Sequence, residues 1–120
     1  MDATSFEFSM QMPGDRRLLL AVRELAAHAA SYARLGQPAA SNLADEVAAA
    51  TEAAIASTHL ADAPLVLAFR RHATGFDVTI RCEAGDSLKT PPAPTAHGLS
   101  VSWAQEGSEH VCRISQRVTA

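Results

Sequence analysis

Strict alternation of apolar and polar residues over residues 76–83 is the feature of this sequence that most constrains its fold. The apolar residues at positions 76, 78, 80 and 82 are separated by polar ones. Because successive side chains of a strand point to opposite faces, this pattern predicts a strand with one buried and one wet face. Residues 65–70 alternate too, and the short link at 72–75 predicts that the two strands form a hairpin.

Three further segments, residues 5–12, 99–103 and 112–118, alternate in the same way and are predicted as strands. The last two are separated by the turn-forming run Gln-Glu-Gly-Ser at 105–108, which predicts a second hairpin. The side chains of these strands that should face the core are Phe6, Phe8, Met10, Met12, Leu99, Val101, Trp103, Cys112, Ile114 and Val118.

Two alanine-rich segments between the first strand and the hairpins have the three- and four-residue periodicity of helices. The first is predicted over residues 16–34, with Asp15 as its N-cap and Gly36 as the residue that ends it. The second is predicted to begin near Ser41 or Asn42, where Asn42 and Asp45 resemble a capping box, and to end near residue 58. His28 lies beside the apolar stripe of the first helix and is interpreted as a packing residue.

Together these elements predict an α+β fold, a two-layer sandwich with helices on one face of a mostly antiparallel sheet. The chain has 120 residues, of which 48% are hydrophobic, so we expect a single domain over residues 1–120 with its own core. Only 5% of the residues are aromatic, so aliphatic and alanine packing should dominate that core.

Charge and composition exclude several classes of partner. The net charge is −3 and no basic block is present, so nucleic acid is not an expected partner. The apolar window at 18–22 is too short and too charged at its flanks to span a bilayer, and the N-terminus has no features of a signal peptide. We therefore expect a cytoplasmic protein without a membrane partner. Cys82 and Cys112 fit no metal or redox spacing and are expected to be reduced core residues.

Two short motifs connect this order of elements with a known family. The second predicted helix contains Thr51-Glu52-Ala53-Ala54-Ile55-Ala56-Ser57, and the first hairpin ends in Cys82-Glu83-Ala84-Gly85-Asp86-Ser87-Leu88. In these motifs and in element order the chain resembles the bacterial anti-sigma factor serine kinases, which have the histidine-kinase-like ATPase fold. That family carries Glu-Ala-x-x-Asn-Ala in the helix and Asp-x-Gly-x-Gly after the hairpin, so each motif is only partly kept here.

The resemblance assigns nucleotide-binding positions to Ala56, Glu83, Gly85 and Ser87, and a catalytic position to Glu52. Ala56 stands where the family has its magnesium-binding asparagine, and a methyl group cannot ligate a hard cation. Glu83 replaces the aspartate that reads adenine, and Ser87 replaces a glycine. After this motif the family has a mobile lid, a Gly-rich turn and a further helix, and this chain has only a proline-rich stretch at 89–98. We therefore expect no metal site and no catalytic residue, and a role for ATP and magnesium only if the altered motifs still function.

The function that the resemblance implies is that of a regulatory protein-binding module similar to an anti-sigma factor, with its nucleotide chemistry lost. The implied partner is a sigma factor or an anti-sigma antagonist, and family members often form homodimers. Two alternatives remain open. One is an active ATP-dependent anti-sigma factor serine/threonine kinase. The other is an unrelated α+β domain that binds a small ligand between the second helix and the sheet.

Three consecutive leucines, Leu18, Leu19 and Leu20, indicate where a partner could bind. At about 100° per residue they span roughly 200° of the helix, so one core-facing stripe cannot bury all of them. At least one should be exposed or covered by another protein. The N-terminal strand is expected at a sheet edge, where unpaired backbone groups can bond a second chain. The first strand and the first helix are therefore the predicted interface.

Overall fold

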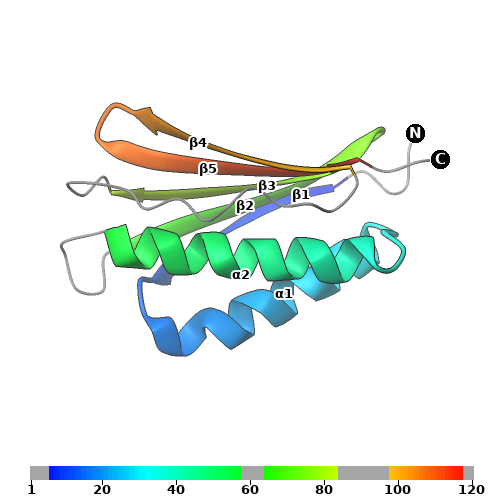
Figure 1. The fold of residues 1–120 in the computed structure, drawn as a ribbon, viewed down its shortest axis with the longest axis horizontal. Helices are drawn as coiled ribbons and strands as arrows, with labels where there is room; N and C mark the ends of the chain where they lie inside the picture. The colour runs from blue at the N-terminus through cyan, green and yellow to red at the C-terminus, as the bar shows by residue number, and fades with distance from the viewer. Residues whose placement is uncertain (1–5, 58–63, 84–97, 118–120) are drawn as a thin grey trace.

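The computed structural model describes residues 6–57, 64–83 and 98–117. Its elements are β1 (Phe6–Pro13), a 3-10 turn (Arg16–Leu18), α1 (Leu19–Tyr32), α2 (Ala39–Ser57), β2 (Pro64–His72), β3 (Gly75–Glu83), β4 (Leu99–Glu106) and β5 (Glu109–Arg117). Both helices cover one face of a five-stranded sheet (Figure 1). The predicted α+β two-layer sandwich is confirmed. No helix in the described part of the chain combines the length and apolarity that a membrane-spanning helix needs.

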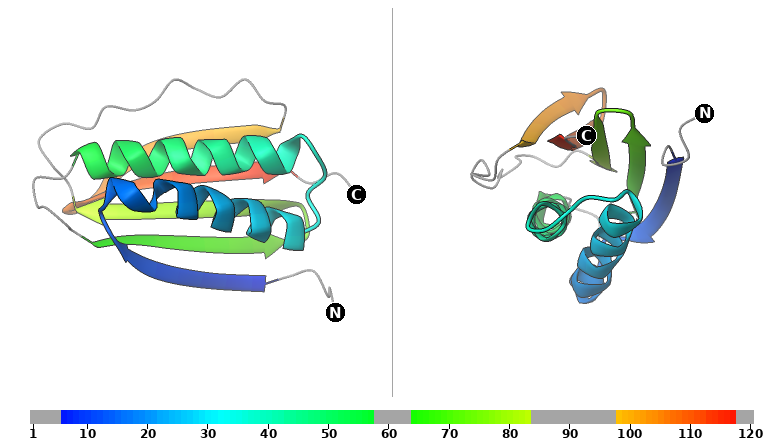
Figure 2. Two further views of the ribbon diagram at one scale, coloured as in Figure 1. Left: turned by 90° about the horizontal axis from the view of Figure 1, so that it is seen from below. Right: turned by 90° about the vertical axis from the view of Figure 1, so that its right-hand side faces the viewer.

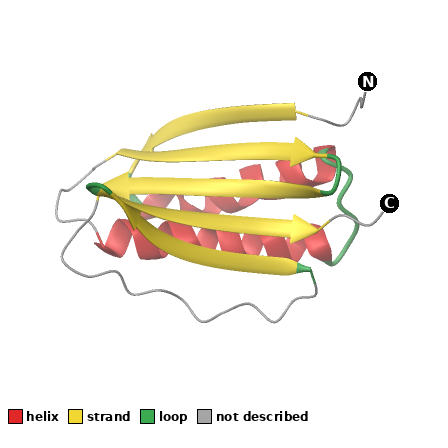
Figure 3. Ribbon diagram, turned by 90° about the horizontal axis from the view of Figure 1, so that it is seen from above, coloured by secondary structure: helices red, strands yellow, loops and turns green. Residues whose placement is uncertain are grey.

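The sheet is antiparallel throughout, with the strand order β1-β2-β3-β5-β4. Both predicted hairpins are confirmed: His72 pairs with Gly75 between β2 and β3, and Glu106 pairs with Glu109 between β4 and β5. Figure 3 shows the face of the sheet that the helices leave open. Strands β1 and β4 form the two edges of the described sheet.

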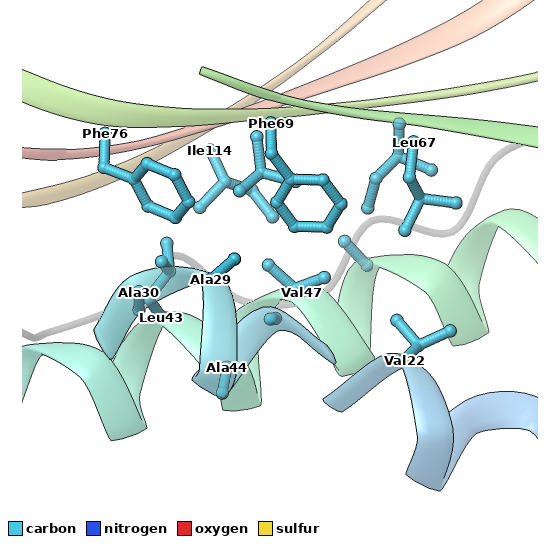
Figure 4. Packing of buried hydrophobic residues seen from close by; sticks show 14 of the residues in the cluster. Val22, Ala29, Ala30, Leu43, Ala44, Val47, Leu67, Phe69, Phe76 and Ile114 are labelled. Carbon is cyan, nitrogen blue, oxygen red and sulfur yellow. The ribbon is translucent and has the colours of Figure 1, made fainter. Parts of the chain in front are cut away.

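The core lies between the inner face of the sheet and the two helices, where side chains from both layers point toward one another (Figure 4). The sheet contributes the larger residues, including Phe69, Phe76 and Ile80, which are fully buried. Alanines such as Ala26 and Ala44 are also fully buried and let the helix backbones approach closely. This pairing of bulky strand residues with small helix residues is the packing that the composition predicts.

The start of the first helix differs from the prediction in one respect. Asp15 is the N-cap, as predicted: its side chain accepts a hydrogen bond of 2.9 Å from the backbone N–H of Arg17. The first turn, however, is a 3-10 turn, and the α-helix begins only at Leu19. Hydrogen bonds from Arg17 also hold the pKa of the Asp15 carboxyl below its ordinary value.

The first helix ends before the predicted residue. It stops at Tyr32, and Arg34 rather than Gly36 adopts the left-handed conformation that terminates it, with φ of 66°. The N–H of Arg34 donates to the carbonyl of Ser31, and the N–H of Leu35 donates to the carbonyl of Ala30, both at 3.0 Å. This pair of bonds is a Schellman motif, in which glycine is the preferred residue at the position of Arg34.

The second helix begins at Ala39, so the predicted capping box at Asn42 is wrong. The backbone N–H of Asn42 already donates to the carbonyl of Pro38 at 2.9 Å, which places Asn42 inside the helix. Asp45 instead accepts a hydrogen bond of 2.7 Å from Nε of Arg23 in α1. The supposed capping residue therefore joins the two helices.

Candidate functional site: an aromatic edge of the sheet

Strand β1 lies at one edge of the sheet and is paired only with β2 among the described strands. Figure 2 shows it beyond α1, at the margin of the helix layer. Edge strands are usually protected from further pairing by several charges, by bulges or by shortness. Over eight residues β1 carries one charged side chain, Glu7, and it pairs with β2 without interruption. Its outer row of backbone groups is thus a weakly protected place for another strand to add.

Aromatic side chains extend from the core to this edge. Phe69 and Phe76 are fully buried, and Phe8 stacks on Phe69 with a centroid distance of 4.9 Å. The ring centroid of Phe6 lies 6.0 Å from that of Phe76. It lies 5.1 Å from that of Tyr32, and these two rings meet edge to face. All four phenylalanines and the single tyrosine of the chain belong to this row.

Exposure rises along the aromatic row as it leaves the helix layer. Phe8 is directly opposite the buried Phe69 in the β1–β2 register, yet it is 38% exposed. Tyr32, the last residue of α1, is 73% exposed. We call the surface formed by Phe6, Phe8, Tyr32 and the outer backbone of β1 the aromatic edge. Aromatic residues are enriched in protein interfaces, so this surface has the composition of a docking site.

The exposure of the three consecutive leucines agrees with the prediction that at least one of them is not buried. Leu18 and Leu19 are half-buried, whereas Leu20 is 66% exposed, which confirms that one core-facing stripe cannot hide all three. Leu20 lies about 200° around α1 from the buried Val22 and therefore faces away from the sheet. It is not part of the aromatic edge, so the predicted interface divides into two separate apolar features.

The motif residues of the family resemblance are not brought together. Glu52 is exposed on α2, and its Oε1 lies 3.8 Å from Nη1 of Arg16. Ala56 is exposed one turn later on the same helix. Glu83 is exposed at the end of β3, where alternation with the buried Cys82 places it on the face opposite the helices. Glu52 and Glu83 therefore belong to different sides of the sandwich. Gly85 and Ser87 lie outside the described residues.

One carboxylate on the helix side of the sheet was not singled out from the sequence. Glu46 of α2 is half-buried, and burial, followed by the charge of Asp45, raises its pKa. Its charge also contributes, after burial, to raising the pKa of the Cys112 thiol to about 12. The sequence could have indicated the partial burial of Glu46 by its position beside Val47, at the margin of the apolar stripe of α2.

The open face of the sheet carries mostly polar side chains, as predicted, although Val66 and the fully buried Val111 also lie on it. A hollow of about 320 Å³ there is lined by Glu7, Arg70, Asp77, Arg113 and uncharged neighbours. Arg113 donates to Glu106 at 2.7 Å, and this hydrogen bond lowers the pKa of the Glu106 carboxyl. Nη2 of Arg113 bonds to Glu106, and Nε of Arg70 lies 3.9 Å from Oε2 of Glu7. Since both arginines that line the hollow have carboxylate neighbours, the hollow has no marked preference for anions.

The structure also tests the predictions for Cys82, Cys112 and His28. Cys82 and Cys112 are buried and not joined by a disulfide, as predicted. His28 is exposed, so its interpretation as a packing residue is wrong. Among residues 6–57, 64–83 and 98–117, no three His, Cys, Asp or Glu side chains are grouped so that they could hold a metal ion.

Comparison with known proteins leaves the family of the chain open. No protein-family model matches the sequence, and no curated protein matches it.

Proposed function

We propose that the chain is a cytoplasmic regulatory protein-binding module, related to the anti-sigma factor serine kinases, that has lost their nucleotide chemistry. The observation that carries the proposal is the aromatic edge, where an unprotected strand and exposed aromatic side chains lie side by side. The partner class comes from the resemblance: a sigma factor or an anti-sigma antagonist domain. A second copy of the chain is the other partner that the resemblance offers.

The edge supports binding by strand addition. A partner strand antiparallel to β1 would bond to its outer backbone groups and extend the sheet, as exposed sheet edges do in peptide recognition. Apolar side chains of that strand would pack against Phe8 and Tyr32 on the helix side. Glu7 is the one charge that the added strand would meet on the open face. Main-chain bonds would thus supply affinity, and the aromatic side chains would supply selectivity.

The active-kinase alternative has less support. The helix position that should bind magnesium holds Ala56, which offers no ligand. Glu52, the position for a catalytic carboxylate, has Arg16 as its ion-pair partner. Glu83 follows the buried Cys82 and therefore lies on the face of the sheet opposite the helix that carries Glu52 and Ala56. This separation gives the active-kinase alternative less support.

The test is direct binding between the purified chain and sigma factors or antagonist domains of the same organism, measured by biolayer interferometry with and without ATP and magnesium. We expect binding that does not depend on nucleotide. Phe8→Glu should weaken it at least tenfold, because the charge would enter the aromatic edge. Val66→Glu is the matched control, since Val66 is 37% exposed on the opposite face of the adjacent strand.

Tyr32→Glu covers the case in which Phe8→Glu disturbs folding, because Tyr32 is at the end of α1 and mostly exposed. It should weaken binding while thermal unfolding stays unchanged. Absence of binding to every sigma factor and antagonist, equal loss in the Val66→Glu control, or a strict requirement for ATP would each contradict the proposal.

A further inference from the structure

Three side chains around the β2–β3 turn are linked by hydrogen bonds. Nε2 of His72 lies 3.0 Å from Oδ2 of Asp77, and Nδ1 of the same ring lies 3.4 Å from Oγ1 of Thr74. Because the ionised carboxylate of Asp77 can only accept, it fixes the ring proton of a neutral histidine on Nε2. Nδ1 then accepts the hydroxyl proton of Thr74. A carboxylate, an imidazole and a hydroxyl linked in this order are the parts of an activated nucleophile.

The β2–β3 register brings the histidine and the aspartate together. His72 pairs with Gly75, so Asp77 is its diagonal neighbour on the open face of the sheet. Gly75 leaves room for the imidazole, since a Cβ atom there would lie 3.2 Å from Cε1 of His72 and 3.0 Å from the backbone oxygen of Gln116. Thr74 is exposed in the turn, so a substrate can reach it.

All three side chains line one hollow of about 540 Å³ on the open face. The lining includes a row of short side chains across three strands, because Asp77 pairs with Ser115 and Ser115 pairs with Ser100. Short side chains in such a row leave a depression beside the β2–β3 turn. A small substrate therefore has space next to the hydroxyl of Thr74.

The charges in the hollow suit a reaction that generates an oxyanion. Arg117 lines the hollow and pairs with Gly75, which places it beside the turn that carries Thr74. Asp77 is the one carboxylate among the described lining residues, and it bonds to His72. A cation next to the reacting atoms stabilises the negative charge that develops on a carbonyl oxygen. The guanidinium of Arg117 can supply this stabilisation.

We infer that this hollow hydrolyses small carboxylic esters, with Thr74 as nucleophile and His72 as general base. Oγ1 of Thr74 attacks the ester carbonyl carbon while Nδ1 of His72 takes the hydroxyl proton. The bond to the alcohol oxygen then breaks, that oxygen takes the proton from His72, and the acyl group stays on Thr74. Water attacks the acyl carbonyl with His72 again as base, which releases the carboxylic acid and returns the proton to Oγ1. Asp77 is a positioning residue that orients the imidazole and stabilises its charged form.

This activity goes beyond the proposed partner binding. His72 and Asp77 are on the open face of the sheet, whereas Phe8 lies opposite the buried Phe69 on the helix side. The ester site therefore does not use the side chains of the aromatic edge, and either proposal can fail alone.

The test follows the hydrolysis of p-nitrophenyl acetate by the purified chain, together with the mass of the peptide that contains residue 74 after brief exposure to the ester. Thr74→Val has nearly the same shape without the hydroxyl, so it should lower the rate at least tenfold and abolish acetylation of this peptide. Thr74→Ser keeps the nucleophile and should retain both. His28→Gln, at an exposed position of α1, is the matched control for unspecific attack by an imidazole and should not change the rate.

Asp77→Asn should lower the rate at least tenfold, because an amide in this place no longer fixes the ring proton, and Asp77→Glu should recover part of the loss. Thermal unfolding of each variant reports folding separately from activity. If Thr74→Val does not fold, the position of the acetyl group on the unaltered chain decides. A rate that ignores Thr74→Val, acetylation only at other residues, an equal loss in His28→Gln, or a full rate in a folded Asp77→Asn variant would each overturn the inference.

Discussion

The buried side chain of Arg71 in β2 donates a hydrogen bond from Nε to the carbonyl oxygen of Ala33, 2.9 Å away, at the C-terminal end of α1. Its Nη1 also donates to the carbonyl oxygens of His72 and Gly75 in the β2–β3 turn. The C-terminal end of a helix carries partial negative charge, which favours a cation there. Arg71 thus joins the helix layer to the first hairpin through backbone oxygens.

Replacing Arg71 by methionine should lower the free energy of unfolding by about 1.5–3 kcal/mol, because buried carbonyl oxygens lose a charged donor while the apolar volume is kept. Urea denaturation measures the change. Arg70→Met at the exposed neighbouring position should stay within about 0.5 kcal/mol of the unaltered chain. Equal midpoints for the unaltered chain and Arg71→Met would show that these bonds add nothing to stability.

Replacing Arg34 by glycine should raise the free energy of unfolding by about 0.5–1 kcal/mol. Arg34 has a φ of 66°, a region in which a Cβ atom is unfavourable and glycine is not. Arg34→Ala removes the same charge but keeps the Cβ atom, so it should give no such gain. Thermal unfolding of the two variants separates the backbone effect from the loss of charge. A gain of equal size in both variants would point to charge instead.

Alkaline stability should depend on Cys112. Burial, and then the charge of Glu46, raises the pKa of its thiol from the ordinary 9.0 to about 12. Above pH 9 the unfolded chain loses this proton while the folded chain keeps it. The contribution of Cys112 to stability is therefore complete below pH 9 and falls by about 1.4 kcal/mol per pH unit toward the folded-state pKa.

Urea denaturation at a series of alkaline pH values tests this dependence against Cys112→Ala. The stability difference between the unaltered chain and the variant should shrink as pH rises, because the variant has no thiol to ionise. A difference that stays constant with pH would mean that the folded-state pKa of Cys112 is not raised.

Millimolar ATP with magnesium should leave the melting temperature unchanged. A ligand present at a hundred times its Kd stabilises the folded state by about 2.7 kcal/mol, which a melting curve detects readily. Ala56 offers no magnesium ligand, and Glu52 and Glu83 lie on different sides of the sandwich. Magnesium alone is the control. A rise in melting temperature with ATP that disappears in Glu83→Ala would restore the nucleotide-binding alternative.

Ile80 and Val66 test the assignment of the two faces of the sheet. Ile80 is fully buried against the helices, so Ile80→Ala should lower the free energy of unfolding by about 2–5 kcal/mol. Val66 is on the open face and 37% exposed, and Val66→Ala should cost clearly less. Equal effects in urea denaturation would contradict the assignment of the faces.

The strands could be predicted from the sequence because burial of one face imposes a period of two on each of them. By the same rule Cys82 faces the helices and its neighbour Glu83 faces the other way. The separation of Glu83 from the helix side therefore follows from the alternation. The helix ends could not be predicted this way. They depend on individual backbone bonds, such as those of Arg34 and of Asn42, for which periodicity holds no information.

The candidate site depends on tertiary arrangement. Phe8 and Phe69 have the same place in their alternating patterns, yet one is exposed and the other buried. The difference arises because β1 lies at the edge, beyond the helix layer, and no local pattern contains strand order.

Pairing of β1 with β2 has a consequence for how the chain folds during its synthesis. Phe8 leaves the ribosome first, and its partner Phe69 follows about 60 positions later, after both helices. At about 5–20 residues per second, β1 waits roughly 3–12 seconds for its neighbour. The two helices follow one another in the sequence and contact each other, so they can associate in that interval. β1 forms an exposed edge of the finished sheet. It is thus also the strand whose apolar side chains wait longest for a partner strand on the nascent chain.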